Sequence, residues 1–143
     1  DVVEKLIKNA EKSVVMTGYS ISDYFTGMLD TIIAKSQQGV YVRFYVNDIE
    51  KSRASLVKML AYRSKYLQFF EYEKNSDDKM AASHAKILTI DSDKSLVSSA
   101  NLSYHGLSGN IEMGFLVRSA DKAKQIEELL KELVRMHVYK KIS

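Results

Sequence analysis

The stretch SHAKILTIDSDKSLVSSAN, residues 83–101, contains two short β-type runs separated by a polar turn. The runs HAKILTID and SLVSSAN are rich in aliphatic and β-branched residues, and Ser92 to Lys94 between them are typical of a tight turn. The stretch therefore predicts a β-hairpin. Because alternate side chains of a strand share a face, His84 and Lys86 are expected to point to the same side.

The rest of the chain alternates helical and extended patterns. Gly39 is placed to end the second of the expected helices, with Ser22 or Asp23 able to cap its start. Helical spacing of apolar residues covers Val2–Lys12, Tyr24–Gln38, Ser52–Ser64 and Asp121–Met136, and further β-type runs cover 13–22, 40–48, 66–73 and 111–118. This order predicts an α/β domain with a mixed β-sheet flanked by helices on both faces.

Length and composition indicate one globular domain. A chain of 143 residues with 45% hydrophobic and 27% charged residues can bury an ordinary core, so we expect residues 1–143 to form a single domain. The chain begins at Asp1 without a methionine, and we expect it to be cut from a longer protein. No apolar run approaches the roughly 20 residues of a membrane-spanning helix, so no span is expected.

Cysteine usage and net charge restrict the function only loosely. The absence of cysteine excludes disulfides and thiolate metal sites, and it favours a reducing compartment, so we expect a cytoplasmic protein. A net charge of +3 would help the chain to bind a polyanion but does not identify one.

The shared face of His84 and Lys86 suggests an anion-binding site. Two cations side by side repel each other unless an anion lies between or above them, and phosphate would be such an anion. Ser99 and Asn101 lie two residues apart on the second strand of the hairpin and would add a hydroxyl and an amide. Together the four side chains could surround a tetrahedral group with donors.

The spacing of the whole stretch is more specific than the pair alone. The fixed positions are His84, Lys86, Asp91, Ser98, Ser99 and Asn101. This pattern resembles the HKD signature of the phospholipase D superfamily, and the continuation ANLSYHGLSGNIEMGFLV, residues 100–117, resembles that of bacterial nuclease-like members. The family usually has glycine where Ser98 stands. The resemblance implies a phospholipase D-like fold.

The resemblance also implies a metal-independent phosphodiesterase with no cofactor. In the family one histidine attacks phosphorus to form a phosphohistidine, and a second histidine protonates the leaving oxygen. By resemblance His84 is the nucleophile or the acid/base, Lys86 and Asn101 stabilise negative charge on the phosphoryl oxygens, and Ser99 supports them. No divalent metal would then be required.

Two carboxylates belong to the same stretch of sequence. The resemblance makes Glu112 the closer partner of His84, where it would fix the tautomer of the imidazole. Asp91 is either a second orienting residue or a structural one that fixes the turn at the end of the strand, and the structural role is the favoured interpretation.

The chain carries only one HKD motif, whereas a site of this family needs two. We therefore expect a homodimer in which two copies of His84 meet across a two-fold axis. The alternative is a second motif in another part of the parent protein.

The favoured activity is that of a nuclease, because the chain is short, has a single motif, is mildly basic and lacks a membrane-binding insertion. DNA is the expected substrate, and an endonuclease is the expected type of enzyme. The alternatives are a phospholipid phosphodiesterase and a non-catalytic DNA-binding module of a restriction or defence complex. A helicase or restriction subunit would then be a partner.

Two further groups of residues have competing interpretations. The aromatic residues could stack on bases, but their alternation in strands favours a place in the core; they are Tyr41, Phe44, Tyr45, Phe69, Phe70 and Tyr72. The basic residues in and directly beside the third expected helix could bind a phosphate backbone or form a solvated face; they are Lys51, Arg53, Lys58, Arg63 and Lys65.

Overall fold

The computed structural model describes residues 2–17, 26–47, 56–73, 86–98 and 114–143. The elements in chain order are α1 (Val2–Lys8), β1 (Ser13–Thr17), α2 (Thr26–Gln37), β2 (Tyr41–Val46), a helical segment at 56–60, β3 (Leu67–Tyr72), β4 (Ile87–Ile90), β5 (Lys94–Ser98), β6 (Gly114–Arg118), α4 (Ala120–Arg135) and β7 (Tyr139–Ile142).

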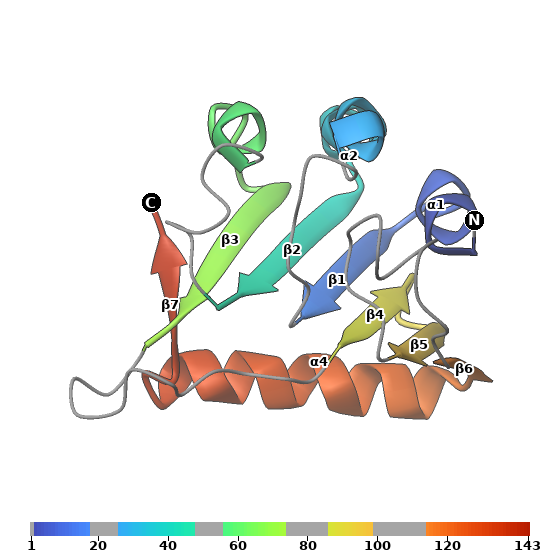
Figure 1. Cartoon of the computed structure of the whole chain (residues 1–143). Helices are drawn as coiled ribbons and strands as arrows, with labels where there is room; N and C mark the ends of the chain where they lie inside the picture. The colour runs from blue at the N-terminus through green and yellow to red at the C-terminus, as the bar shows by residue number, and fades with distance from the viewer. Residues whose placement is uncertain (1, 18–25, 48–55, 74–85, 99–113) are drawn as a thin grey trace.

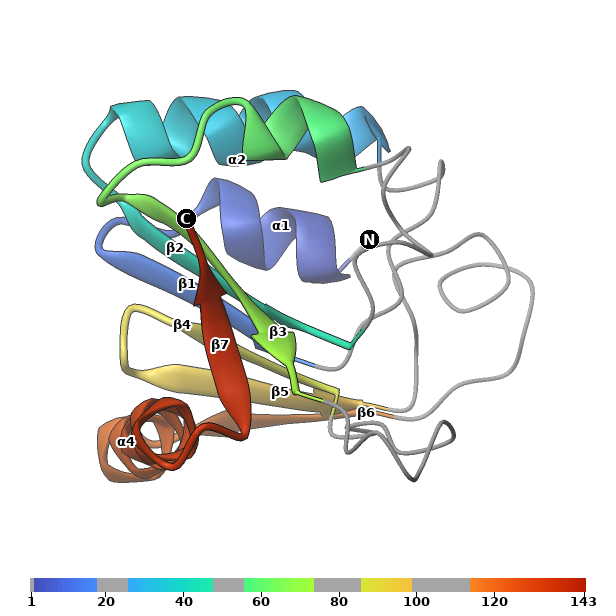
Figure 2. The same cartoon turned by 90° about the vertical axis from the view of Figure 1, so that its left-hand side faces the viewer.

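The seven strands form one mixed sheet in the order β6-β5-β4-β1-β2-β3-β7 (Figure 1). Strands β1, β2 and β3 run parallel to one another. The pairs β1–β4, β4–β5, β5–β6 and β3–β7 are antiparallel. Helices α1 and α2 and the segment at 56–60 cover one face, and α4 crosses the other (Figures 1 and 2). The expected α/β architecture with helices on both faces is confirmed.

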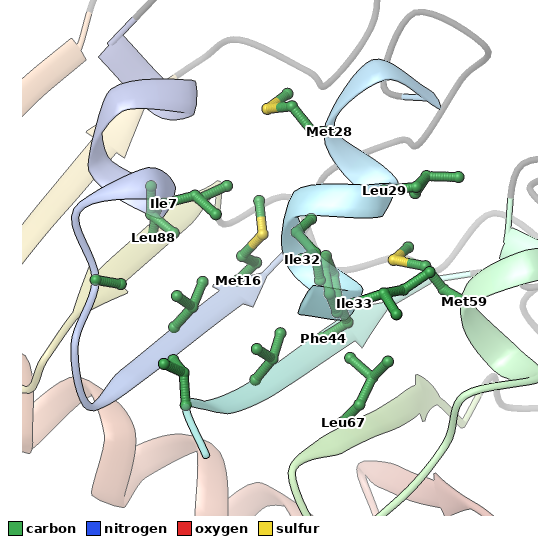
Figure 3. Packing of buried hydrophobic residues seen from close by; sticks show 14 of the residues in the cluster. Ile7, Met16, Met28, Leu29, Ile32, Ile33, Phe44, Met59, Leu67 and Leu88 are labelled. Carbon is green, nitrogen blue, oxygen red and sulfur yellow. The ribbon is translucent and has the colours of Figure 1, made fainter. Parts of the chain in front are cut away.

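The larger core lies between the sheet and the helices of the first face (Figure 3). From the sheet, Met16, Phe44 and Leu88 are at most 2% exposed, and they pack in one cluster with Ile7 of α1 and Ile32 of α2. The stacked rings of Phe44 and Phe69 join β2 to β3, with their centroids 5.5 Å apart. Burial of these apolar surfaces supplies the main driving force for folding.

A second, smaller core joins α4 to the opposite face of the sheet. Leu130 of α4 is 7% exposed and clusters with the buried Val15, Tyr45, Phe70 and Tyr139. The helix begins after Ser119, whose side chain accepts a hydrogen bond of 3.2 Å from the Lys122 amide. Such a cap satisfies one of the free amides in the first helical turn.

The first expected helix is shorter than the sequence predicts. The apolar spacing predicts a helix that extends to Lys12, but α1 ends at Lys8. The reason is a long-range contact, since the amides of Glu11, Lys12 and Ser13 all donate to the carboxylate of Asp91 instead of to helical carbonyls. The expected turn of the hairpin is also displaced by one residue, because β5 already begins at Lys94.

Candidate active site

The hairpin of the HKD-like stretch forms as β4 and β5, and Lys86 directly precedes β4. The Lys86 carbonyl accepts a hydrogen bond of 3.0 Å from the Ser98 amide, which continues the ladder between the strands. The Ile87 amide donates to the Thr17 hydroxyl at 3.3 Å. These two contacts fix the backbone at Lys86 between the ends of β1 and β5. Lys86 as a whole is partly buried.

One face of β4 packs in the larger core, because Leu88 and Ile90, two residues apart, are 0% and 4% exposed. Thr89 points to the other face, where its hydroxyl donates to Glu127 of α4 at 2.9 Å. The Ser92 hydroxyl donates to the second oxygen of Glu127 at 2.8 Å, so α4 is attached to the hairpin at two points. The period of two predicted for this strand is therefore observed.

Lys86 lies at the end of the sheet where several strand ends meet. Thr17 ends β1 and is in register with Tyr45 of β2 and with Ile87 of β4. Ser98 ends β5 opposite Gly114, the first residue of β6. Ligand sites of open α/β sheets commonly lie outside the carboxyl ends of the parallel strands, and this end of the sheet has that position. We refer to it as the carboxyl edge.

Four of the six predicted site residues lie outside the described residues; they are His84, Ser99, Asn101 and Glu112. Their neighbours in the chain are described. Lys86 is two residues from His84, Ser98 directly precedes Ser99, and Gly114 is two residues after Glu112. All three of these neighbours lie at the carboxyl edge.

Asp91 lies at the other end of β4, in the turn to β5. Its carboxylate accepts hydrogen bonds of 3.0, 2.7 and 3.0 Å from the amides of Glu11, Lys12 and Ser13. Burial raises the pKa of Asp91, but these three backbone donors outweigh burial, and the pKa lies below its usual value. The backbone at Asp91 is left-handed, with a φ of 57°. These contacts are those of the structural role, in which Asp91 fixes the turn and the start of β1.

Ser98 occupies the position where the family usually has glycine. It faces Gly114 across β5 and β6, and a Cβ added to Gly114 would lie 3.4 Å from the Ser98 Cβ and 3.4 Å from the Val97 carbonyl oxygen. These distances lie at the short end of ordinary van der Waals contact. Ser98 therefore packs directly against the backbone of Gly114.

The aromatic residues considered as base-stacking partners are mostly core residues. Phe44, Tyr45, Phe69 and Phe70 are at most 7% exposed. Burial raises the pKa of Tyr45 to about 12, which is the expected effect of withdrawing a phenol from water. Tyr41, in contrast, is 39% exposed.

The basic helical segment is described only in part. Lys51 and Arg53 lie outside the described residues, and Lys58 forms an ion pair of 2.5 Å with Asp30 of α2. The hydrogen bond and charge of Asp30 raise the pKa of Lys58. For Lys58 the solvated-face interpretation is therefore the better one.

The described part of the chain has no group of three or more His, Cys, Asp or Glu side chains placed to hold a metal ion. Within the same residues, no helix has the length and apolarity needed to cross a membrane.

Known proteins resemble this chain over nearly its whole length. Residues 3–134 match the family described as cardiolipin synthase, PLD-like domain. The DISARM protein DrmC of Bacillus paralicheniformis is 31% identical over 141 residues, which are 99% of this chain and 58% of DrmC. The chain therefore spans somewhat more than half the length of this relative.

Solved structures share the fold. Nuc of Salmonella typhimurium, described as a phospholipase D family member, has a TM-score of 0.76 at 17% identity, and the match covers 99% of this chain and 88% of Nuc. NucT of Helicobacter pylori has a TM-score of 0.74 at 17% identity, covering 96% of this chain and 87% of NucT.

Proposed function

This chain belongs to the phospholipase D-like phosphodiesterase family, and from that membership we propose that it is a metal-independent nuclease that cleaves DNA. The observation that carries the proposal is the HKD spacing of residues 84–101. Lys86 of this motif lies at the carboxyl edge, which is the end of the sheet where ligands commonly bind. The net charge of +3 favours a polyanionic substrate.

We assign the chemistry to the residues of the motif. The imidazole of His84 attacks phosphorus and forms an N–P bond while the bond from phosphorus to the leaving oxygen breaks, and a second histidine gives a proton to that oxygen. Water activated by that second histidine then breaks the N–P bond and restores free His84. Lys86 and Asn101, supported by Ser99, stabilise the negative charge on the phosphoryl oxygens, and Glu112 orients His84. Asp91 keeps its structural role in this proposal.

The second histidine is supplied by a second copy of the chain in a homodimer. The exposed apolar residues of β6 and its neighbour support this part of the proposal. Phe115 is 68% exposed, and Val97, Leu116 and Val117 are between 39% and 42% exposed. β6 is also the last strand on its side of the described sheet, and its first residue lies at the carboxyl edge. Alternation places Phe115 and Val117 on one face, beside Val97, and Leu116 on the other. Exposed apolar residues gathered at the last strand of a sheet are typical of an interface.

One other substrate has support from a specific observation. The matching family is described by a lipid enzyme, cardiolipin synthase, so phospholipid is the alternative substrate. The similarity to DrmC, which is named as a DISARM protein, supports a partner in a restriction or defence complex.

The deciding experiment is cleavage of single- and double-stranded DNA in excess EDTA by the wild-type chain and by His84→Ala. We expect wild-type cleavage to survive EDTA and the variant to be inactive, with a dimeric mass for both in solution. Phosphatidylcholine vesicles under the same conditions test the alternative substrate. Cleavage of the vesicles alone, or of DNA only after addition of a divalent metal, would contradict the proposal.

Mixing the two proteins tests the shared site. If subunits exchange freely, an equimolar mixture of wild type and His84→Ala contains roughly a quarter of wild-type dimers, and its specific activity should fall accordingly. A monomeric mass, or an activity that falls only in proportion to dilution, would instead place the second histidine within the same polypeptide.

A further inference from the structure

Two adjoining hollows lie on the β2, β3 and β7 side of the molecule, and they share one residue, Gln68. The first hollow, of about 270 Å³, lies between the sheet and α4 and is lined by Arg43, Tyr45, Gln68, Phe70, Lys131, Val134 and Arg135. The second, also of about 270 Å³, is lined by Arg63, Ser64, Leu67, Gln68, Lys141, Ile142 and Ser143. Figure 2 shows β3, β7 and one end of α4 on this side.

The charged side chains that line these hollows are all cationic. Among the described residues that line them, none is Asp or Glu, and five carry a positive charge: Arg43, Arg63, Lys131, Arg135 and Lys141. Lys131 contacts Glu128 at 3.4 Å, and Arg135 contacts Glu132, but these are exposed pairs within one helix. Because exposed pairs contribute little free energy, an anion in the hollow can compete for both cations.

The first hollow has a rigid aromatic floor. Tyr45 and Phe70 are 3% and 7% exposed, and their rings stack with centroids 4.7 Å apart and planes 11° apart. Arg43 and Gln68 stand opposite each other in register on β2 and β3. Guanidinium groups bind phosphate oxygens in a bidentate manner, and the Gln68 amide offers further donors. Cations above an apolar floor suit a phosphate that is joined to a sugar.

The second hollow lies at the end of the sheet opposite to the proposed catalytic site, and the first lies between the sheet and α4. Leu67 and Ile142, which line the second hollow, belong to the ends of β3 and β7 opposite to the pair Tyr72 and Tyr139 at the carboxyl edge. A ligand bound there does not occupy the site of cleavage. Two adjoining cationic hollows fit a ligand that carries phosphates in series, as a nucleic-acid strand does.

We propose that these hollows form a second phosphate-binding surface, which holds a nucleic-acid strand outside the cleavage site. The residues of this basic surface are Arg43, Arg63, Gln68, Lys131, Arg135 and Lys141. The inference rests on the proposed nuclease function for its substrate class. Its role is affinity, because none of these residues belongs to the strand ends that surround Lys86.

The test compares two variants with equal loss of charge. The first carries Arg43→Gln, Lys131→Gln and Arg135→Gln. The control carries Lys5→Gln, Lys122→Gln and Lys124→Gln, which are exposed and lie outside both hollows. Binding of a fluorescent single-stranded 30-mer is measured by anisotropy over a range of salt concentrations. A third variant, Lys131→Gln with Arg135→Gln and Lys141→Gln, leaves the partly buried Arg43 intact in case its replacement affects folding.

We expect the first and third variants to bind at least about tenfold more weakly than wild type, with a salt dependence whose slope falls by roughly 0.7 for each phosphate that is no longer neutralised. The control should change affinity by less than about twofold. Hydrolysis of bis(p-nitrophenyl) phosphate, a diester too small to reach the basic surface from the cleavage site, should be unchanged in all three.

Equal weakening by the first variant and the control would overturn the inference, because net charge alone would then explain the binding. The inference would also be overturned if the first variant lost affinity for adenosine monophosphate but kept its affinity for the 30-mer, because the hollow would then bind a mononucleotide and not a strand. If wild type cleaves DNA but all variants bind it normally, only this inference fails. If wild type neither binds nor cleaves nucleic acid, the proposed nuclease function fails with it.

Discussion

Two lysines at opposite ends of the same hairpin differ in their expected contribution to catalysis. Lys86 precedes β4 at the carboxyl edge, whereas Lys94 begins β5 at the other end. We expect Lys86→Met to lower the rate of DNA cleavage by about 100-fold, because a fixed cationic donor to the phosphoryl oxygens is removed. Lys94→Met should change the rate by less than about twofold. Similar losses in the two variants, measured in single turnover, would argue against a catalytic role for Lys86.

The contacts of Asp91 predict a loss of stability in Asp91→Asn. Asparagine tolerates the left-handed backbone and keeps an acceptor oxygen, but it lacks the negative charge that strengthens the three amide hydrogen bonds to Oδ1. Urea unfolding at pH 7 should show a destabilisation of about 2 kcal/mol. The neighbouring Asp93→Asn is the control, because Asp93 is exposed in the same turn; an equal loss there would contradict the structural role of Asp91.

The lowered pKa of Asp91 also predicts how this contribution varies with pH. The pKa of Asp91 is lower in the folded state than in the unfolded state, where it is about 3.9. Ionised Asp91 therefore stabilises the fold at pH values above the unfolded pKa. This contribution is lost as the pH falls through the folded pKa. The difference in unfolding free energy between wild type and Asp91→Asn should therefore be constant from about pH 7 to about pH 5 and shrink below about pH 4. A difference that grows on acidification would be inconsistent with this assignment.

Residue patterns predict the alternation of this strand but not the hydrogen-bond partners of Asp91. Alternation is confirmed within β4, where Leu88 and Ile90 pack in the larger core and Thr89 contacts Glu127 of α4. The partners of Asp91 could not be predicted, because Glu11, Lys12 and Ser13 lie 78 to 80 positions away in the chain. Only the pairing of β1 with β4 brings them together. The position of Asp91 at a strand end favours a structural role in the sequence, but the sequence does not identify the amides that it binds.

At the scale of elements, the amphipathic helix α4 offers a matched pair of positions. Leu129 and Leu130 both belong to the apolar residues with helical spacing in the sequence of this helix. In the structure, however, Leu129 is 59% exposed and Leu130 is 7% exposed. We expect Leu130→Ala to destabilise the fold by about 3 kcal/mol, because it leaves a cavity against Tyr45 and Phe70, and Leu129→Ala by less than about 0.5 kcal/mol. Thermal unfolding of the two variants measures the difference, and a larger effect at Leu129 would contradict the packing of α4.

The one described strand that the sequence does not predict is β7. Its sequence YKKI contains two lysines in four residues, and lysine has a low strand propensity. The strand forms because β3 offers it an edge and because Tyr139, 3% exposed, packs against Tyr45. Both reasons are tertiary, so local sequence signals could not show them. The other strands carry apolar alternation or apolar runs and are predictable for that reason.

At the scale of the whole molecule, the exposed residues of β6 predict how two copies associate. Phe115→Glu places a charge in the surface proposed for the homodimer, and we expect a monomeric mass by light scattering and loss of most DNA cleavage. Leu129→Glu is the control, because Leu129 is similarly exposed but lies on α4. A Phe115→Glu protein that remains a fully active dimer would exclude β6 from the interface.

The number of chains in the active protein can be inferred from sequence only by counting motifs. The single HKD-like motif predicts either a second copy of the chain or a second motif in another part of the parent protein, and the apolar sequence of β6 fits a buried strand as well as an exposed interface strand. Strand pairing and burial distinguish a buried strand from an exposed one. In the described sheet β6 pairs only with β5, and all five of its residues are exposed.

The position of Asp91 has a consequence for how relatives of this chain can diverge. Its carboxylate fixes the register of β1 and the β4–β5 turn from the end of the sheet opposite to Lys86. Changes in the length or composition of the connections that leave the carboxyl edge therefore need not disturb that register. Evolution can exchange those connections, and with them substrate preference, while inheriting the same scaffold.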